Sequence, residues 1–175
     1  MKTVVQLKLS FLLFFGLLNT GLKAQEASSE NLMATFIYNF TNYVEWDKPS
    51  SDSVFNIVIL GDGKLDKPLQ YIASIKMVGQ KKIRIIQSEN QSAPDQCDLL
   101  FVPEAQIELL ENYNSHFPEH QTLIISATEN GLEKGAMINF TNLDGKIGFE
   151  INHTAIRNQG LKVSSRLLKI AVKVI

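Results

Sequence analysis

Two histidines lie at the spacing that metal sites on helices use, because His116 and His120 are four residues apart. Ligands at that spacing face one side of an α-helix and can hold a zinc ion together. Pro118 lies between them, and a proline inside a helix removes a hydrogen bond and clashes with the preceding turn. A zinc protease also needs its glutamate directly after the first histidine, where this chain has Phe117. The sequence therefore predicts no metal site.

A glycine pair could also hold a cofactor, since Gly61-Asp62-Gly63 lies between an apolar run and a helical pattern. A dinucleotide-binding turn needs a third glycine, and Leu65-Asp66 occupies its place. The chain also lacks the Gly-x-Ser-x-Gly motif of a nucleophile elbow. We therefore interpret residues 61–63 as a plain turn. We predict no catalytic residues, no cofactor and no enzymatic activity.

Charged and amide side chains near the end of the chain form a second group. Alternation along a strand places Glu150 and Asn152 on one face, with Arg157 on the helix that follows. A Glu–Arg pair there would fix the strand to the C-terminal helices. Asn39 lies within a helical pattern and is expected to hydrogen-bond a neighbouring loop. We predict a structural polar network of Asn39, Glu150, Asn152 and Arg157, with a ligand-binding role as the alternative.

The basic residues Lys76, Lys81, Lys82 and Arg84 lie close together in the sequence and could hold an anion, although such charges are more typical of ordinary solvated surface. Cys97 is the one cysteine of the chain, so no disulfide can form within it. Cys97 precedes an apolar strand, which predicts a buried structural thiol. Pairing with another molecule or redox sensing is the alternative.

The first 24 residues have the layout of a secretory signal, with Lys2 and Lys8 before an apolar run and Ala24 at the expected cleavage point. The run has ten residues before Asn19, whereas a membrane-spanning helix needs about 20. An uncleaved anchor is the alternative. The remaining residues 25–175 fit one domain and carry 14 basic and 18 acidic residues, a net charge of −4. This charge argues against nucleic-acid binding.

Strand-like and helical patterns alternate along the remainder. Apolar residues spaced by three and four predict an amphipathic helix from Ser29 that runs to Trp46. Buried strands are predicted at 55–60, 83–86, 99–102 and 122–125, with helices from 65 to 74 and after Pro103. Asp144-Gly145 predicts a hairpin, and two short helices follow. The fold class is α/β, with three layers, a mostly parallel mixed sheet, helices on both faces and a C-terminal antiparallel hairpin.

Three blocks of sequence, in this order, resemble the YfiR family of small periplasmic proteins, over about residues 30–172. The first block is an aromatic helix that ends in the only tryptophan, the second is a pair of buried strands, and the third is the hairpin with its following helices. Their residues are Phe36-Ile37-Tyr38-Asn39-Phe40 with Tyr43-Val44-Glu45-Trp46 and Pro49; Phe55-Asn56-Ile57-Val58-Ile59-Leu60-Gly61-Asp62 with Cys97-Asp98-Leu99-Leu100-Phe101-Val102; and Gly135-Ala136-Met137-Ile138-Asn139-Phe140, Phe149-Glu150-Ile151-Asn152 and Gly160-Leu161-Lys162-Val163-Ser164-Ser165-Arg166-Leu167-Leu168.

The resemblance implies a periplasmic regulator that binds, and in the best-understood members represses, an inner-membrane signalling protein such as a diguanylate cyclase or a sensor kinase. Its output would be cyclic-di-GMP and biofilm formation. We name Tyr43, Trp46, Leu167 and Leu168 as candidate contacts, because aromatic and apolar side chains near an edge make good anchors. Trp46 as a core residue is the alternative for that position. A homodimer is also expected.

The alternative function is a periplasmic small-molecule-binding module without a protein partner. The strand ends at Gly61-Asp62 and Val102-Pro103 would then line a crevice, as ligand sites in sheets of this kind do.

Overall fold

The structure is a computed structural model that describes residues 29–46, 53–61, 63–88, 96–110 and 121–175. The predicted signal peptide at residues 1–24 lies outside the described residues, as do Asp62, His116 and His120. Within the described ranges, no helix combines the length and the apolar character that crossing a membrane requires.

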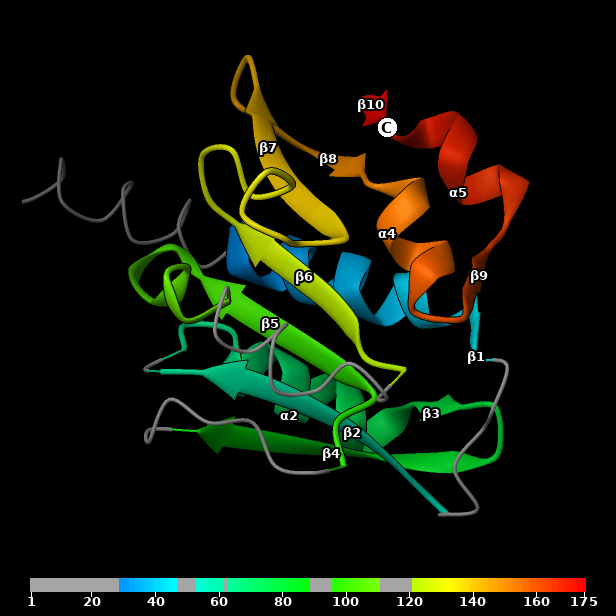
Figure 1. Ribbon diagram of the computed structural model, residues 1–175. Helices are drawn as coiled ribbons and strands as arrows, with labels where there is room; N and C mark the ends of the chain where they lie inside the picture. Colours follow the sequence, from blue (N-terminus) through cyan, green and yellow to red (C-terminus); the bar gives the residue numbers. More distant parts are fainter. Residues whose placement is uncertain (1–28, 47–52, 62, 89–95, 111–120) are drawn as a thin grey trace, which may run out of the picture.

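Eight strands form one mixed sheet in the order β10-β8-β7-β6-β5-β2-β4-β3 (Figure 1). The five strands from β4 to β7 pair in parallel, whereas β3–β4 and β7–β8 are antiparallel. This arrangement confirms the predicted α/β class with a mostly parallel sheet and a C-terminal hairpin. The strands are β1 (Val44–Trp46), β2 (Val54–Leu60), β3 (Met77–Val78), β4 (Lys81–Ser88), β5 (Leu99–Pro103), β6 (Leu123–Ala127), β7 (Ile138–Leu143), β8 (Lys146–Ile151), β9 (Leu161–Val163) and β10 (Lys173–Val174).

The described helices occupy the connections between these strands. The N-terminal helix covers residues 29–41, and α2 (Asp66–Ile75), α4 (His153–Asn158) and α5 (Ser165–Ile170) follow, with a short 3-10 helix at Glu104–Gln106. Pro68 lies in the first turn of α2, where a missing N–H has no intrahelical partner to lose. Asn152 caps α4 by accepting a hydrogen bond from the Ala155 N–H at 2.8 Å, and Ser164 caps α5.

Both faces of the central strands are buried, because every residue of β2 from Phe55 to Leu60 is buried. The N-terminal helix lies against one face of the sheet (Figure 1). Its phenylalanines pack against those of the hairpin. The ring of Phe40 lies 4.9 Å from that of Phe149 and 5.8 Å from that of Phe140. These rings meet at the edge-to-face and tilted angles that aromatic pairs prefer. The helix is thus held to the sheet by its apolar stripe.

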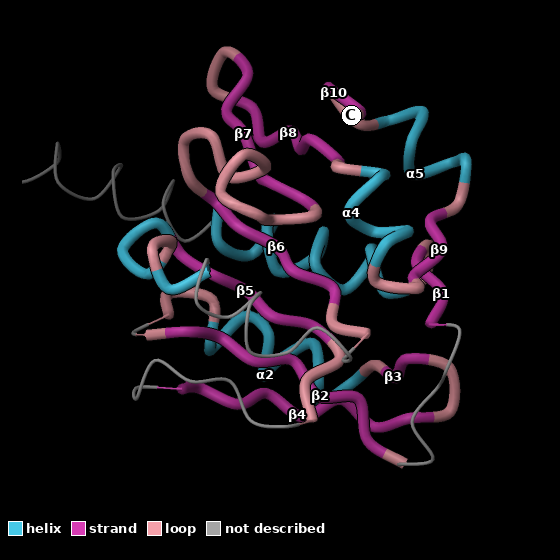
Figure 2. Tube along the Cα trace, in the orientation of Figure 1, coloured by secondary structure: helices cyan, strands magenta, loops and turns pink. Residues whose placement is uncertain are grey.

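The chain between Thr41 and Trp46 differs from the prediction, since it is a turn and a strand and not the end of a helix. The Asn42 and Tyr43 N–H groups donate to carbonyls three residues back, which tightens and ends the helix. Strand β1 then pairs antiparallel with β9, placing Val44 opposite Val163 and Trp46 opposite Leu161. Figure 2 shows this two-stranded sheet beside the large one.

The last residues include a strand, whereas the sequence predicted only two short helices after the hairpin. Helix α5 ends at Ile170, and Lys173–Val174 form β10, which pairs in parallel with β8 at the end of the large sheet. The other end of the sheet holds β3, which reverses into β4 at Gly79, a residue with a φ of 58°. Each of these strands has two residues.

Candidate functional site

The residues predicted as partner contacts gather around β1, β9 and α5. Tyr43 precedes β1 and Trp46 is its last residue. The Tyr43 carbonyl accepts a hydrogen bond of 2.8 Å from the backbone N–H of Ser164, the N-cap of α5. This bond ties the end of the N-terminal helix to the start of α5. Segments about 120 residues apart in the sequence are therefore neighbours in space.

Trp46 is half-buried and packs edge to face on Phe55, with 5.1 Å between ring centroids. Its indole nitrogen is buried and has no hydrogen-bond partner among the described residues. The packing places the ring against the core, so the part of Trp46 left on the surface is small. Tyr43 is also half-buried.

Leu167 and Leu168 differ in their exposure. Leu167 is 1% exposed and packs in the core, so it cannot contact a partner in this conformation. Leu168 is half-buried, and Ile170 on the same helix is 63% exposed. Ile170, which was not among the contacts predicted from the sequence, is the main apolar side chain that α5 presents.

Exposed apolar side chains continue from α5 along the β10 edge. Val172, Val174 and Ile175 are exposed, and Leu143 from the tip of the hairpin joins them. Leu143 and Val172 meet above Gly148, where an added Cβ would lie 2.9 Å from Val172 Cγ2 and 3.1 Å from Leu143 Cδ1. We call Leu143, Ile170, Val172, Val174 and Ile175 the C-terminal surface.

Positive charge accompanies this surface. Residues 162–175 contain Lys162, Arg166, Lys169 and Lys173 and no acidic residue, although the whole chain has a net charge of −1. Arg166, Lys169 and Lys173 are exposed. Exposed apolar groups bordered by charge of one sign are typical of binding surfaces.

The structure does not bring the four residues of the predicted polar network together. Asn152 is a helix cap, and Asn39 is exposed on the N-terminal helix. Arg157 is exposed, and within the described part of the chain it forms no ion pair with Glu150. Among the described residues, no hydrogen bond or ion pair therefore supports the grouping of these four side chains that their sequence spacing suggested.

The polar network that does exist lies between β6 and β7. Asn139 is 3% exposed, and its Oδ1 accepts from Ser126 Oγ at 2.7 Å and from the Thr128 N–H at 3.2 Å. Its Nδ2 donates to the Thr128 carbonyl at 3.0 Å. A Cβ on Gly131 would collide with Asn139 Oδ1 and Ser126 Oγ, so the loop needs a glycine there. Ser126 and Asn139 are polar residues inside otherwise apolar strands, and this was the sequence signal from which the network could have been predicted.

The described residues hold no group of three histidine, cysteine, aspartate or glutamate side chains that could bind a metal. The Cys97 side chain is buried, which confirms the prediction of a buried thiol. The Cys97 carbonyl accepts a hydrogen bond of 2.6 Å from Thr122 Oγ1, joining the chain before β5 to the start of β6.

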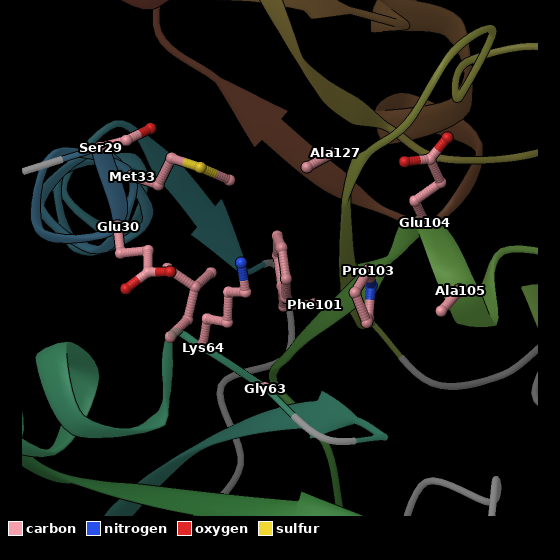
Figure 3. A pocket seen from close by; sticks show the side chains of 11 residues that line it. Ser29, Glu30, Met33, Gly63, Lys64, Phe101, Pro103, Glu104, Ala105 and Ala127 are labelled. Atoms are coloured by element: carbon pink, nitrogen blue, oxygen red, sulfur yellow. The ribbon is translucent and has the colours of Figure 1, made fainter. Parts of the chain in front are cut away.

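A cavity of about 700 Å³ lies where three parallel strands end, close to the crevice predicted for a small-molecule site. Its lining includes Gly63 and Lys64 after β2, Pro103 at the end of β5, Glu104 directly after it, and Ala127 at the end of β6 (Figure 3). Gly61 and Val102, which the sequence suggested, are buried next to these residues and are not part of the lining.

Comparison with a solved structure supports the fold. The chain is similar to the crystal structure of a conserved domain protein from Vibrio cholerae, with a TM-score of 0.56 and 13% identity, covering 83% of this chain and 60% of that one. It therefore spans less than two thirds of the length of that protein. A second similar structure is the ABC domain in complex with L-Trp from Streptococcus pneumonia, with a TM-score of 0.47 and 10% identity, covering 69% of this chain and 55% of that one. No curated protein sequence matches.

The family comparison is more specific, because the YfiR/HmsC-like family matches residues 30–172, nearly all of the described domain. The matched range runs from the N-terminal helix to Val172, directly before β10. Of the C-terminal surface it includes Leu143, Ile170 and Val172, and it leaves out Val174 and Ile175. The chain belongs to the YfiR/HmsC-like family, whose members are periplasmic and regulatory.

Proposed function

We propose that the protein is a periplasmic regulator that binds the extracytoplasmic part of an inner-membrane signalling protein and represses it. Diguanylate cyclases and sensor kinases are the partner classes that fit. Residues 1–24 would act as the cleaved export signal. Membership of the YfiR/HmsC-like family supports the regulatory role and the periplasmic location.

The observation that carries the proposal is the C-terminal surface itself. Four of its five apolar side chains come from residues 170–175, at an edge strand whose outer side has no neighbouring strand within the described sheet. Edge strands with apolar side chains are places where another chain can pair and bury surface. The basic residues beside this edge favour a partner segment that carries acidic residues.

The positive charge beside the C-terminal surface also disfavours a homodimer that pairs through this surface. Two copies that met through this surface would bring Arg166, Lys169 and Lys173 of each close together, and like charges at an interface oppose association. A homodimer, as the sequence led us to expect, would therefore use another face and leave the C-terminal surface open to the signalling protein.

Capture from solubilised inner membranes by the tagged full-length protein tests the proposal. Ile170→Asp places a carboxylate on the most exposed apolar position of the surface, and we expect it to reduce capture of the partner at least about tenfold. Ile75→Asp is the matched control, because Ile75 is 58% exposed at the opposite end of the sheet.

In cells, loss of binding should release the partner, so the Ile170→Asp strain should show raised cyclic-di-GMP or kinase output while the Ile75→Asp strain resembles the wild type. If both folded variants capture the membrane protein as the parent does, the C-terminal surface is not the contact. If the wild-type protein captures no membrane signalling protein, the regulatory proposal fails.

A further inference from the structure

The cavity at the strand ends lies where the chain stops adding strands on one side of β2 and begins to add them on the other. From β2 the chain goes first to β4 on one side and then to β5 and β6 on the other. The loops that leave β2 and β5 therefore diverge, and a crevice forms beyond the carboxyl ends of these strands. The start of the N-terminal helix, with Ser29, Glu30 and Met33, supplies a further wall.

The floor of the cavity is apolar. Phe101 lies in the middle of the view, with Met33 to its left, Ala127 above it and Pro103 to its right (Figure 3). Leu65 adds a buried aliphatic side chain. A cavity of about 700 Å³ with an apolar floor is in the size range of sites that hold small organic molecules, about 300–1,000 Å³.

The rim carries charge at two places. Glu30 and Lys64 lie on one side of Phe101, and Glu104 lies on the other (Figure 3). The lining therefore contains two carboxylates and one ammonium group. Among the described residues, no side chain donates a hydrogen bond to the Glu104 carboxylate or forms an ion pair with it. A ligand that fills the floor and reaches Glu104 would bring the compensating positive charge.

We propose that this cavity binds a small molecule with an apolar, ring-sized body and a primary amine, the body resting on Phe101 and Met33 and the ammonium group directed to Glu104. The site goes beyond the proposed function, because it concerns a ligand of the regulator and not its membrane partner. It lies at the strand ends next to the N-terminal helix, whereas the C-terminal surface lies at the β10 edge.

Three probes of matched size test the ligand class by titration calorimetry on the isolated full-length protein. Phenethylamine carries the ammonium group, phenethyl alcohol is neutral and hydrocinnamate carries a carboxylate. We expect phenethylamine to bind about fivefold more tightly than hydrocinnamate, with the alcohol between them, because a partly exposed ion pair is worth up to about that factor.

Two variants locate the site. Glu104→Gln should weaken phenethylamine binding about fivefold and leave phenethyl alcohol unchanged. Glu108→Gln removes the same charge four residues away, outside the lining, and should change neither. Ala127→Phe fills the cavity and should abolish binding of all three probes. Since Ala127→Phe could also disturb folding, Glu104→Gln at an exposed position is the decisive variant.

The proposal is overturned if hydrocinnamate binds as tightly as phenethylamine, if phenethylamine does not bind at about 10 mM, or if Glu104→Gln and Glu108→Gln behave alike. These experiments use no membrane partner. Failure here therefore leaves the regulatory proposal standing, and failure to capture a partner leaves the ligand site standing. A ligand site without any captured partner would favour the stand-alone binding module.

Discussion

The cavity at the strand ends and the C-terminal surface differ in shape, charge and construction. The cavity is a recess formed by loops that follow successive parallel strands, and its charged lining is Glu30, Lys64 and Glu104. The C-terminal surface is an open edge with exposed aliphatic side chains beside Arg166, Lys169 and Lys173. Recesses with an apolar floor suit small molecules, whereas open edges suit a second chain.

One element lines the cavity and continues toward the C-terminal region. The N-terminal helix lines the cavity with Ser29, Glu30 and Met33, and its other end leads into β1, which pairs with β9 beside α5. The N-terminal helix therefore runs from the proposed small-molecule site toward the side of the fold that carries the proposed protein-binding surface. The hydrogen bond from the Ser164 N–H to the Tyr43 carbonyl is the connection at the far end.

The largest expected change in the free energy of unfolding comes from the core of the C-terminal region, and a matched change on its surface should have little effect. Leu167→Ala should lower the free energy of unfolding by about 2–5 kcal/mol, because Leu167 is buried and its removal leaves a cavity. Ile170→Ala, three residues along the same helix, should change it by less than about 0.5 kcal/mol. Urea denaturation of the two variants measures both. Equal losses would mean that Ile170 belongs to the core and that the surface is misassigned.

The second prediction concerns the loop next to the cavity. Asn139→Ala removes the amide that holds Thr128 and Ser126, so it should cost about 1–3 kcal/mol in the free energy of unfolding. It should also weaken phenethylamine binding, because Ala127 precedes this loop and lines the cavity. Asn142→Ala, at an exposed turn of the same strand, is the control and should leave ligand binding unchanged. If Asn139→Ala and Asn142→Ala changed phenethylamine binding equally, the role of Asn139 in shaping the cavity would be contradicted.

The smallest effect is expected for Glu150 and Arg157. Because the two side chains form no ion pair, the double-mutant cycle of Glu150→Gln and Arg157→Gln should give a coupling energy within about 0.3 kcal/mol of zero. Thermal unfolding of the four proteins measures it. A coupling near 1 kcal/mol would restore the polar network that the sequence suggested.

Much of the fold could be predicted from sequence because its long elements bury regular patterns. The apolar runs at β2, β5 and β6 are continuous, as strands buried on both faces must be. The Asp144-Gly145 turn has φ values of 50° and 82°, which its residue types favour. Local rules of this kind act between neighbours in the chain and are therefore visible in one sequence.

Strands of two or three residues escaped prediction because they carry no periodicity. Val44–Trp46 continues the helical spacing of Phe36 and Phe40, and only pairing with Leu161–Val163 makes it a strand. Lys173–Val174 becomes a strand because β8 offers a free edge. Packing between distant segments also explains why the sequence named Leu167 and not Ile170 as a contact. The two residues look alike in sequence and differ only in what packs over them.

Hydrogen exchange of the full-length protein tests the separation of the two regions most directly. Bound to its captured membrane partner, the protein should show slowed exchange at residues 165–175 and unchanged exchange at residues 63–65. With phenethylamine in place of the partner, the 63–65 segment should be slowed directly. Partner protection at 63–65 with none at 165–175 would contradict the account.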